Sequence, residues 1–90
     1  MKAAVYGVGT TLFGKQPERT AGQLVATAVR EAAADAGIDL TRIEAVYVGT
    51  VFGEAGAATR TLQQVGVVGV PIITIENACA SGTTAYHEAA

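Results

Sequence analysis

Three short apolar runs separated by helical patterns are the feature that most constrains the fold of this 90-residue chain. The runs span residues 3–8, 45–51 and 70–75, and each is nearly continuous in apolar or β-branched residues. Such runs are typical of strands covered on both faces, as in a parallel sheet flanked by helices. Half of the residues are apolar and 16% are charged, which excludes a disordered chain. The pattern predicts an α/β fold with a mostly parallel sheet.

The clearest helix is predicted between the first two runs. It begins with a capping-box pattern at Thr20 and Gln23, and Gly37 suits the left-handed position that ends a helix. We expect its apolar face to contact the strands. That face contains Leu24, Val25, Ala28, Val29, Ala32, Ala33 and Ala36.

Further along, a small-residue loop at 53–58 is predicted to lead into a short helix at 58–67, and residues 81–90 are predicted to form the last helix. Gly7 and Gly9, at the end of the first run, are interpreted as turn residues. A dinucleotide fingerprint would need a third glycine where Leu12 stands, and the first helix begins too far downstream to meet a phosphate.

Cys79 lies at the junction between the third run and the last helix. The first turn of a helix has free N–H groups and a positive dipole end, which favour a thiolate, the nucleophilic form of cysteine. Small neighbours would let a substrate approach closely: Ala78, Ala80, Ser81 and Gly82. The alternative interpretation is an inert, buried cysteine, since free cysteines are often buried.

Two segments of the sequence resemble the thiolase family. The resemblance is strongest to the branch that includes the sterol-carrier-protein thiolases. Residues 77–82, Asn-Ala-Cys-Ala-Ser-Gly, resemble the thiolase nucleophile motif. Residues 5–15 resemble the opening strand and loop of the same family, and the spacing between the two segments also fits. The resemblance covers essentially all 90 residues. It implies the N-terminal part of a thiolase-like fold, ordered β-α-β-α-β-α, with the nucleophile at the start of a buried helix.

The resemblance also implies a function. Thiolases cleave a 3-ketoacyl-CoA with a second CoA, or run the reverse condensation, through an acyl-cysteine intermediate. Cys79 would be the nucleophile, and acyl-CoA and CoA would be substrates, with no permanently bound cofactor. The complete protein would form a homodimer or higher oligomer and act in lipid metabolism.

Other catalytic motifs of the family are missing from these residues. A Gly-His-Pro histidine, a Cys-x-Gly cysteine and an asparagine–glutamate motif do not occur in the sequence. We therefore expect residues 1–90 to be an incomplete N-terminal fragment of a thiolase-like domain, inactive alone. A β-ketoacyl synthase-like fragment and a non-catalytic α/β fragment with an inert cysteine remain alternatives.

The other ionisable candidates are assigned no catalytic role. Eight residues of helix separate His87 from Cys79, about 12 Å at ~1.5 Å per residue, which is too far for a hydrogen bond. Glu76 is interpreted as a carboxylate at a strand end, and Glu54 as a solvated side chain.

Composition excludes several other classes. The net charge of −2 gives no basic patch for nucleic acid. One cysteine and one histidine make a metal site improbable and an internal disulfide impossible, which suits a reducing compartment such as the cytoplasm. No apolar run approaches the ~20 residues needed to span a bilayer.

Overall fold

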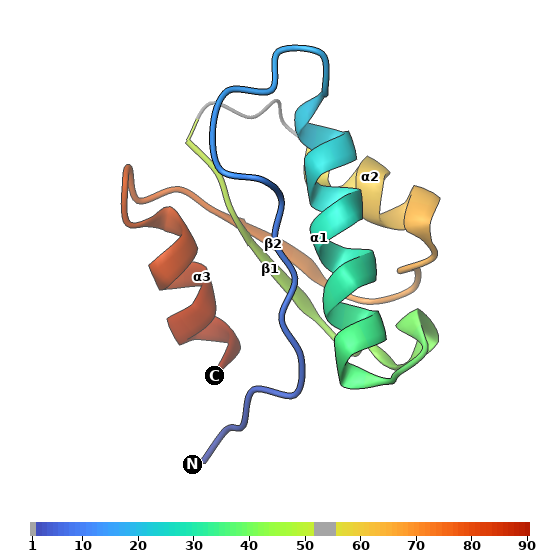
Figure 1. Ribbon diagram of the computed structural model, residues 1–90. Helices are drawn as coiled ribbons and strands as arrows, with labels where there is room; N and C mark the ends of the chain where they lie inside the picture. Colours follow the sequence, from blue (N-terminus) through green and yellow to red (C-terminus); the bar gives the residue numbers. More distant parts are fainter. Residues whose placement is uncertain (1, 52–55) are drawn as a thin grey trace.

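Two parallel strands form the sheet of the computed structural model, which describes residues 2–51 and 56–90 (Figure 1). The strands are β1 (Val46–Gly49) and β2 (Ile72–Ile75). Val46 lies opposite Ile72 and Gly49 lies opposite Ile75. The parallel pairing, with helices between and after the strands, confirms the α/β class. Both strands are shorter than the apolar runs that predicted them.

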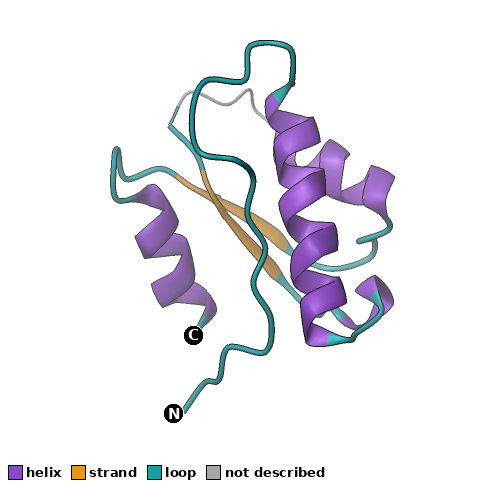
Figure 2. Cartoon of the chain, viewed as in Figure 1, coloured by secondary structure: helices purple, strands orange, loops and turns teal. Residues whose placement is uncertain are grey.

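Helices flank the two strands on opposite sides (Figures 1 and 2). On one side, α3 (Ser81–Ala89) packs on β1 and β2. On the other side, α2 (Ala57–Val65) connects the strands and packs on β2. The longest helix, α1 (Ala21–Ala36), packs on α2, and a short 3-10 helix, η1 (Leu40–Arg42), follows it. α2 begins and ends close to the predicted 58–67 bounds, although the predicted loop before it lies partly outside the described residues, and Glu54 lies wholly outside them.

The ends of α1 follow from the predicted capping residues. The Gln23 backbone N–H donates to the Thr20 hydroxyl at 3.1 Å. In return, the Thr20 N–H donates to the Gln23 side-chain oxygen at 2.9 Å. At the other end Gly37 adopts a left-handed φ of 68°, and its N–H bonds to carbonyls of the last turn. The capping box and the glycine stop are both confirmed.

The first apolar run does not form a strand, so this prediction was wrong. Residues 3–9 follow an extended path along α1 (Figure 1) and have no sheet partner. Side-chain carboxylates of α1 accept hydrogen bonds from this backbone: the Val8 N–H donates to Asp35 at 2.9 Å, and the Thr10 N–H donates to Glu31 at 3.3 Å. The segment thus packs against α1 and does not pair with a strand. Its side chains Tyr6 and Val8 remain exposed.

Gly7 and Gly9 serve close packing, which corrects their interpretation as turn residues. Neither has a positive φ. A Cβ at Gly7 would overlap the Ala32 carbonyl oxygen, and one at Gly9 would overlap the Ala28 carbonyl oxygen. The extended segment can therefore lie directly against the α1 backbone. The predicted apolar face of α1 is only partly covered, and its main contacts are α2 and this segment, not β1 and β2.

Few side chains of the described residues are buried. Leu62 of α2 and Val67, just after it, are 1% and 2% exposed. Ser81 and Ala85 of α3 are buried at the interface with the strands. Only one face of α3 is covered, so this helix is half-buried where the sequence predicted a buried one. A polar residue, Ser81, thus belongs to the small core.

Candidate functional site at the β2–α3 connection

The connection between β2 and α3 is a tight turn built from residues 76–80. The Ala80 N–H donates to the Asn77 carbonyl at 3.0 Å. The Ser81 N–H then donates to the Ala78 carbonyl at 3.2 Å, and α3 begins at Ser81. Cys79 lies within this turn, two residues before the helix, and is exposed and not in a disulfide. The structure therefore confirms the strand–helix junction, and the exposure of Cys79 contradicts the buried-cysteine interpretation.

The backbone of the turn is strained immediately before Cys79. Ala78 has a φ of 46°, the one positive φ among the non-glycine residues described. This left-handed conformation is unfavourable for residues with a Cβ and persists only where the surroundings enforce it. A strained residue between a strand and a helix also occurs at nucleophile elbows, where it exposes the reactive side chain.

Ser81 is the buried polar residue beneath the turn. It is 4% exposed. Its hydroxyl accepts a hydrogen bond from the Asn77 N–H at 2.7 Å and donates one to the Ala78 carbonyl at 2.7 Å. A serine hydroxyl has a single proton to donate, and here that proton goes to the turn. The prediction that Ser81 makes room for a substrate was wrong, because this residue faces the protein interior.

Two more side chains bind the same turn from its exposed side. The Glu76 carboxylate accepts a hydrogen bond from the Ala78 N–H at 2.6 Å. The Asn77 side-chain amide donates to the Thr84 hydroxyl at 3.0 Å, which joins the turn to the first turn of α3. Glu76 is therefore a carboxylate at a strand end, as predicted, and it holds the backbone beside Cys79. The hydrogen bonds of Asn77 were not predicted, since no spacing rule assigns them.

Gly49 at the end of β1 lets α3 approach the sheet. A Cβ at this position would lie 2.5 Å from both the carbonyl carbon and oxygen of Ser81, and 2.7 Å from the Gly82 nitrogen. These are backbone atoms that no side-chain rotation can move away. Gly49 thus sets the depth at which the start of α3, and with it Ser81, rests on the strands.

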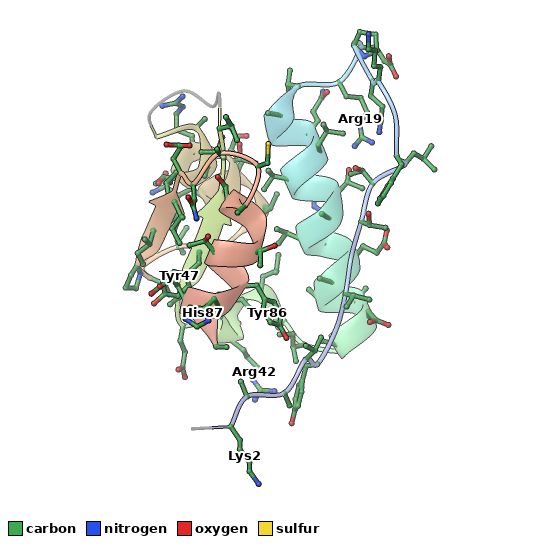
Figure 3. All side chains as sticks on the ribbon, turned by 90° about the vertical axis from the view of Figure 1, so that its left-hand side faces the viewer. Lys2, Arg19, Arg42, Tyr47, Tyr86 and His87 are labelled. Carbon is green, nitrogen blue, oxygen red and sulfur yellow. The ribbon has the colours of Figure 1, made fainter. Side chains whose placement is uncertain are left out.

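His87 lies in the last turn of α3 and is exposed, as predicted (Figure 3). Within the described residues, no cluster of three histidine, cysteine or carboxylate groups could hold a metal ion. In the same part of the chain, no helix is long and apolar enough to cross a membrane.

An apolar cavity of about 460 Å³ opens elsewhere in the molecule. It is bounded by the extended N-terminal segment, the end of α1, the start of β1 and the end of α3. Tyr6, Tyr47 and Tyr86 are among its lining residues, and Cys79 is not. The cavity is therefore separate from the cysteine turn.

An exposed cysteine on a strained strand-to-helix turn defines a candidate nucleophile. Comparison with known proteins shows the family to which the chain belongs. The pattern of the thiolase N-terminal domain matches residues 3–90. The chain therefore belongs to the thiolase family, through the N-terminal domain.

Curated relatives agree with this assignment. Chicken (Gallus gallus) sterol carrier protein 2 is 39% identical over 84 residues, which cover 90% of this chain. Human sterol carrier protein 2 is 38% identical over 89 residues, covering 94% of the chain. Acetyl-CoA acetyltransferase of Methanocaldococcus jannaschii is 34% identical over 91 residues, covering 96%. The chain spans 15% and 16% of the two sterol carrier proteins and 23% of the acetyltransferase.

Solved structures share the fold. The priming β-ketosynthase of the R1128 polyketide pathway matches 83% of this chain with a TM-score of 0.72 and 26% identity, over 23% of its own length. The 3-oxoacyl-[acyl-carrier-protein] synthase III of Aquifex aeolicus matches 80% of this chain with a TM-score of 0.68, over 24% of its own length. Its identity of 21% supports the fold alone.

Proposed function

We propose that this sequence supplies the nucleophile of a thiolase-type acyltransferase and that Cys79 carries the acyl group. The observation that carries the proposal is the exposed thiol on the strained turn, at the position of the family's nucleophile motif. The substrates would be a 3-ketoacyl-CoA and CoA. In keeping with thiolase chemistry, no permanently bound cofactor is needed.

In the proposed reaction, the Cys79 thiolate attacks the C3 keto carbon of the 3-ketoacyl-CoA. The bond between C2 and C3 then breaks, and acetyl-CoA leaves as a carbanion that takes up a proton. The shortened acyl group remains on sulfur as a thioester. The thiolate of a second CoA attacks this thioester, which releases the shortened acyl-CoA and restores Cys79.

The residues that move protons are proposed to lie outside these 90 residues. The sequence has one histidine, in the last turn of α3. The helix from Ser81 to His87 is about 9 Å long at ~1.5 Å per residue, and Cys79 lies two residues before that helix. A base must come within hydrogen-bond reach of the group it deprotonates. We therefore propose that the chain is the N-terminal part of a catalytic unit and is inactive alone. As the likeness to thiolases suggests, we also propose that the complete protein is a homodimer or higher oligomer.

A β-ketoacyl synthase-like condensing enzyme is the second candidate, since the priming β-ketosynthase, at 26% identity, is a synthase of that kind. The thiolase proposal is preferred because the curated relatives include an acetyl-CoA acetyltransferase at 34% identity. The acyl acceptor distinguishes the two: a thiolase passes the acyl group from its cysteine to CoA, whereas a ketoacyl synthase extends the acyl group on a carrier protein.

The direct test is thiolytic cleavage of acetoacetyl-CoA by the full-length protein that contains this sequence, compared with its Cys79→Ala variant. Loss of a covalent nucleophile is expected to lower kcat by at least about 10⁴-fold. A second variant, His87→Ala, serves as the matched control and should keep wild-type activity. Cleavage by Cys79→Ala at a wild-type rate would contradict the proposed function.

A further inference from the structure

The hydroxyl of Ser81 makes its two hydrogen bonds to the turn that precedes Cys79. Its partners are the Asn77 N–H and the Ala78 carbonyl, both at 2.7 Å. These partners lie four and three residues before Ser81, upstream of the cysteine. The side chain therefore closes the turn around Cys79, while its own backbone starts α3.

These two hydrogen bonds matter because the backbone of Ala78 is in the left-handed conformation. An alanine at a φ of 46° relaxes toward negative φ unless other interactions hold it. Ser81 is 4% exposed, so water cannot replace its hydrogen bonds. The Glu76 contact to the Ala78 N–H is exposed and competes with water. Ser81 is therefore the stronger of the two side-chain restraints on Ala78, in addition to the backbone bond from the Ser81 N–H to the Ala78 carbonyl.

The direction of the Cys79 side chain depends on this conformation. Ala78 directly precedes Cys79, so a change of its φ and ψ rotates the following peptide and moves the thiol. Covalent catalysis needs the attacking atom within about 3–3.5 Å of the reacting carbon, and a displacement of about 1 Å can lower the rate about a hundredfold.

We propose that Ser81 is a positioning residue, which holds Ala78 in the left-handed conformation and so directs the Cys79 thiol toward its substrate. This inference rests on the proposed function of Cys79. Ser81 touches neither substrate nor thiol in this role and acts through the backbone of the turn.

The test uses a double-mutant cycle in the full-length protein, because glycine adopts a positive φ without the penalty that alanine has. Ser81→Ala is expected to slow acylation of Cys79 by acetoacetyl-CoA about ten- to a hundredfold, with KM changed less than about threefold. Adding Ala78→Gly to Ser81→Ala should recover most of that loss. Ala78→Gly alone completes the cycle and gives the reference rate for the double variant. Thr83→Ala, an exposed site on the same helix, is the control and should acylate at close to the wild-type rate.

A crystal structure of the Ser81→Ala variant is the second measurement and does not depend on activity. It should show Ala78 displaced from positive φ. The inference is contradicted if Ser81→Ala acylates normally, if its defect persists with Ala78→Gly, or if Ala78 keeps its conformation in the variant. If wild-type Cys79 is never acylated, the proposed function fails instead, and the crystal structures still decide whether Ser81 holds the turn.

Discussion

In both the Cys79 turn and the N-terminal extended segment, a glycine allows close packing against a helix, but the two contacts differ in how well they are covered. In both, glycines allow a backbone to approach a helix: Gly49 brings β1 against the start of α3, and Gly9 brings the extended segment against α1. The first contact is covered, and Ser81 there is 4% exposed. The second lies at the surface, where Tyr6 is 80% exposed. We therefore expect close packing to contribute more to stability at Gly49, where other elements cover the contact, than at Gly9.

The largest stability effect is expected at Gly49. A Cβ there would meet Ser81 and Gly82 backbone atoms at 2.5–2.7 Å, so Gly49→Ala must push α3 away from β1. We expect a loss of about 3 kcal/mol in the free energy of unfolding, measured by urea denaturation. Gly82→Ala is the matched control, since nothing lies within 4 Å of its Cβ position, and it should be neutral or stabilising. Equal effects of the two substitutions would show that α3 does not depend on this close approach.

A smaller effect is expected at Gly9, although its Cβ would overlap the Ala28 carbonyl oxygen. The extended segment can lift from α1 without uncovering a core, so Gly9→Ala should cost about 1 kcal/mol or less. Hydrogen exchange should reveal the change, because the Val8 amide loses its bond to Asp35 and exchanges faster. A destabilisation as large as that of Gly49→Ala would mean that the segment is part of the cooperative core.

The same contrast explains what the sequence could predict. Local signals succeeded: the Thr20 capping box and the left-handed Gly37 are encoded within a few residues, and both ends of α1 are confirmed. The Cys79 junction was also predicted, because a β-branched run directly precedes a helix.

Non-local arrangements were not predicted. An apolar run indicates burial but not the partner that provides it, so residues 3–8 were assigned to a sheet in which they do not pair. The same limit applies to Ser81. The position of Ser81 in the motif could be read from the sequence. Its burial could not, because it depends on β1, more than 30 residues away in the sequence.

Thr20 offers a test of a purely local signal, the capping box at the start of α1. Thr20→Ala removes the oxygen that accepts the Gln23 N–H, and we expect about 1 kcal/mol of destabilisation in thermal unfolding. Thr20→Ser keeps the hydroxyl and should retain most of the stability. If Thr20→Ala were neutral, packing on α2 alone would determine where α1 begins.

The smallest effect is expected at Asp39, in front of η1. Hydrogen bonds from the Thr41 N–H and then from the Thr41 hydroxyl lower the pKa of this carboxyl below its ordinary value of 3.8. A lowered folded-state pKa adds stability above the unfolded-state pKa and loses it as pH falls through the folded-state value. The Tm of wild type should thus slightly exceed that of Asp39→Asn near neutral pH, and the difference should disappear in acid. A Tm difference that grows on acidification would contradict the direction of this shift.

We propose that the strained turn presents Cys79 as a nucleophile, and a trapped acyl intermediate is the most direct test. The full-length protein is mixed with acetoacetyl-CoA, quenched in acid, digested and analysed by mass spectrometry. We predict an acetyl group on Cys79 that forms before the first turnover is complete and disappears when CoA is added. Acetoacetyl-CoA cleavage with Cys79 unmodified at every time point, or with the acetyl group on another residue, would contradict the account.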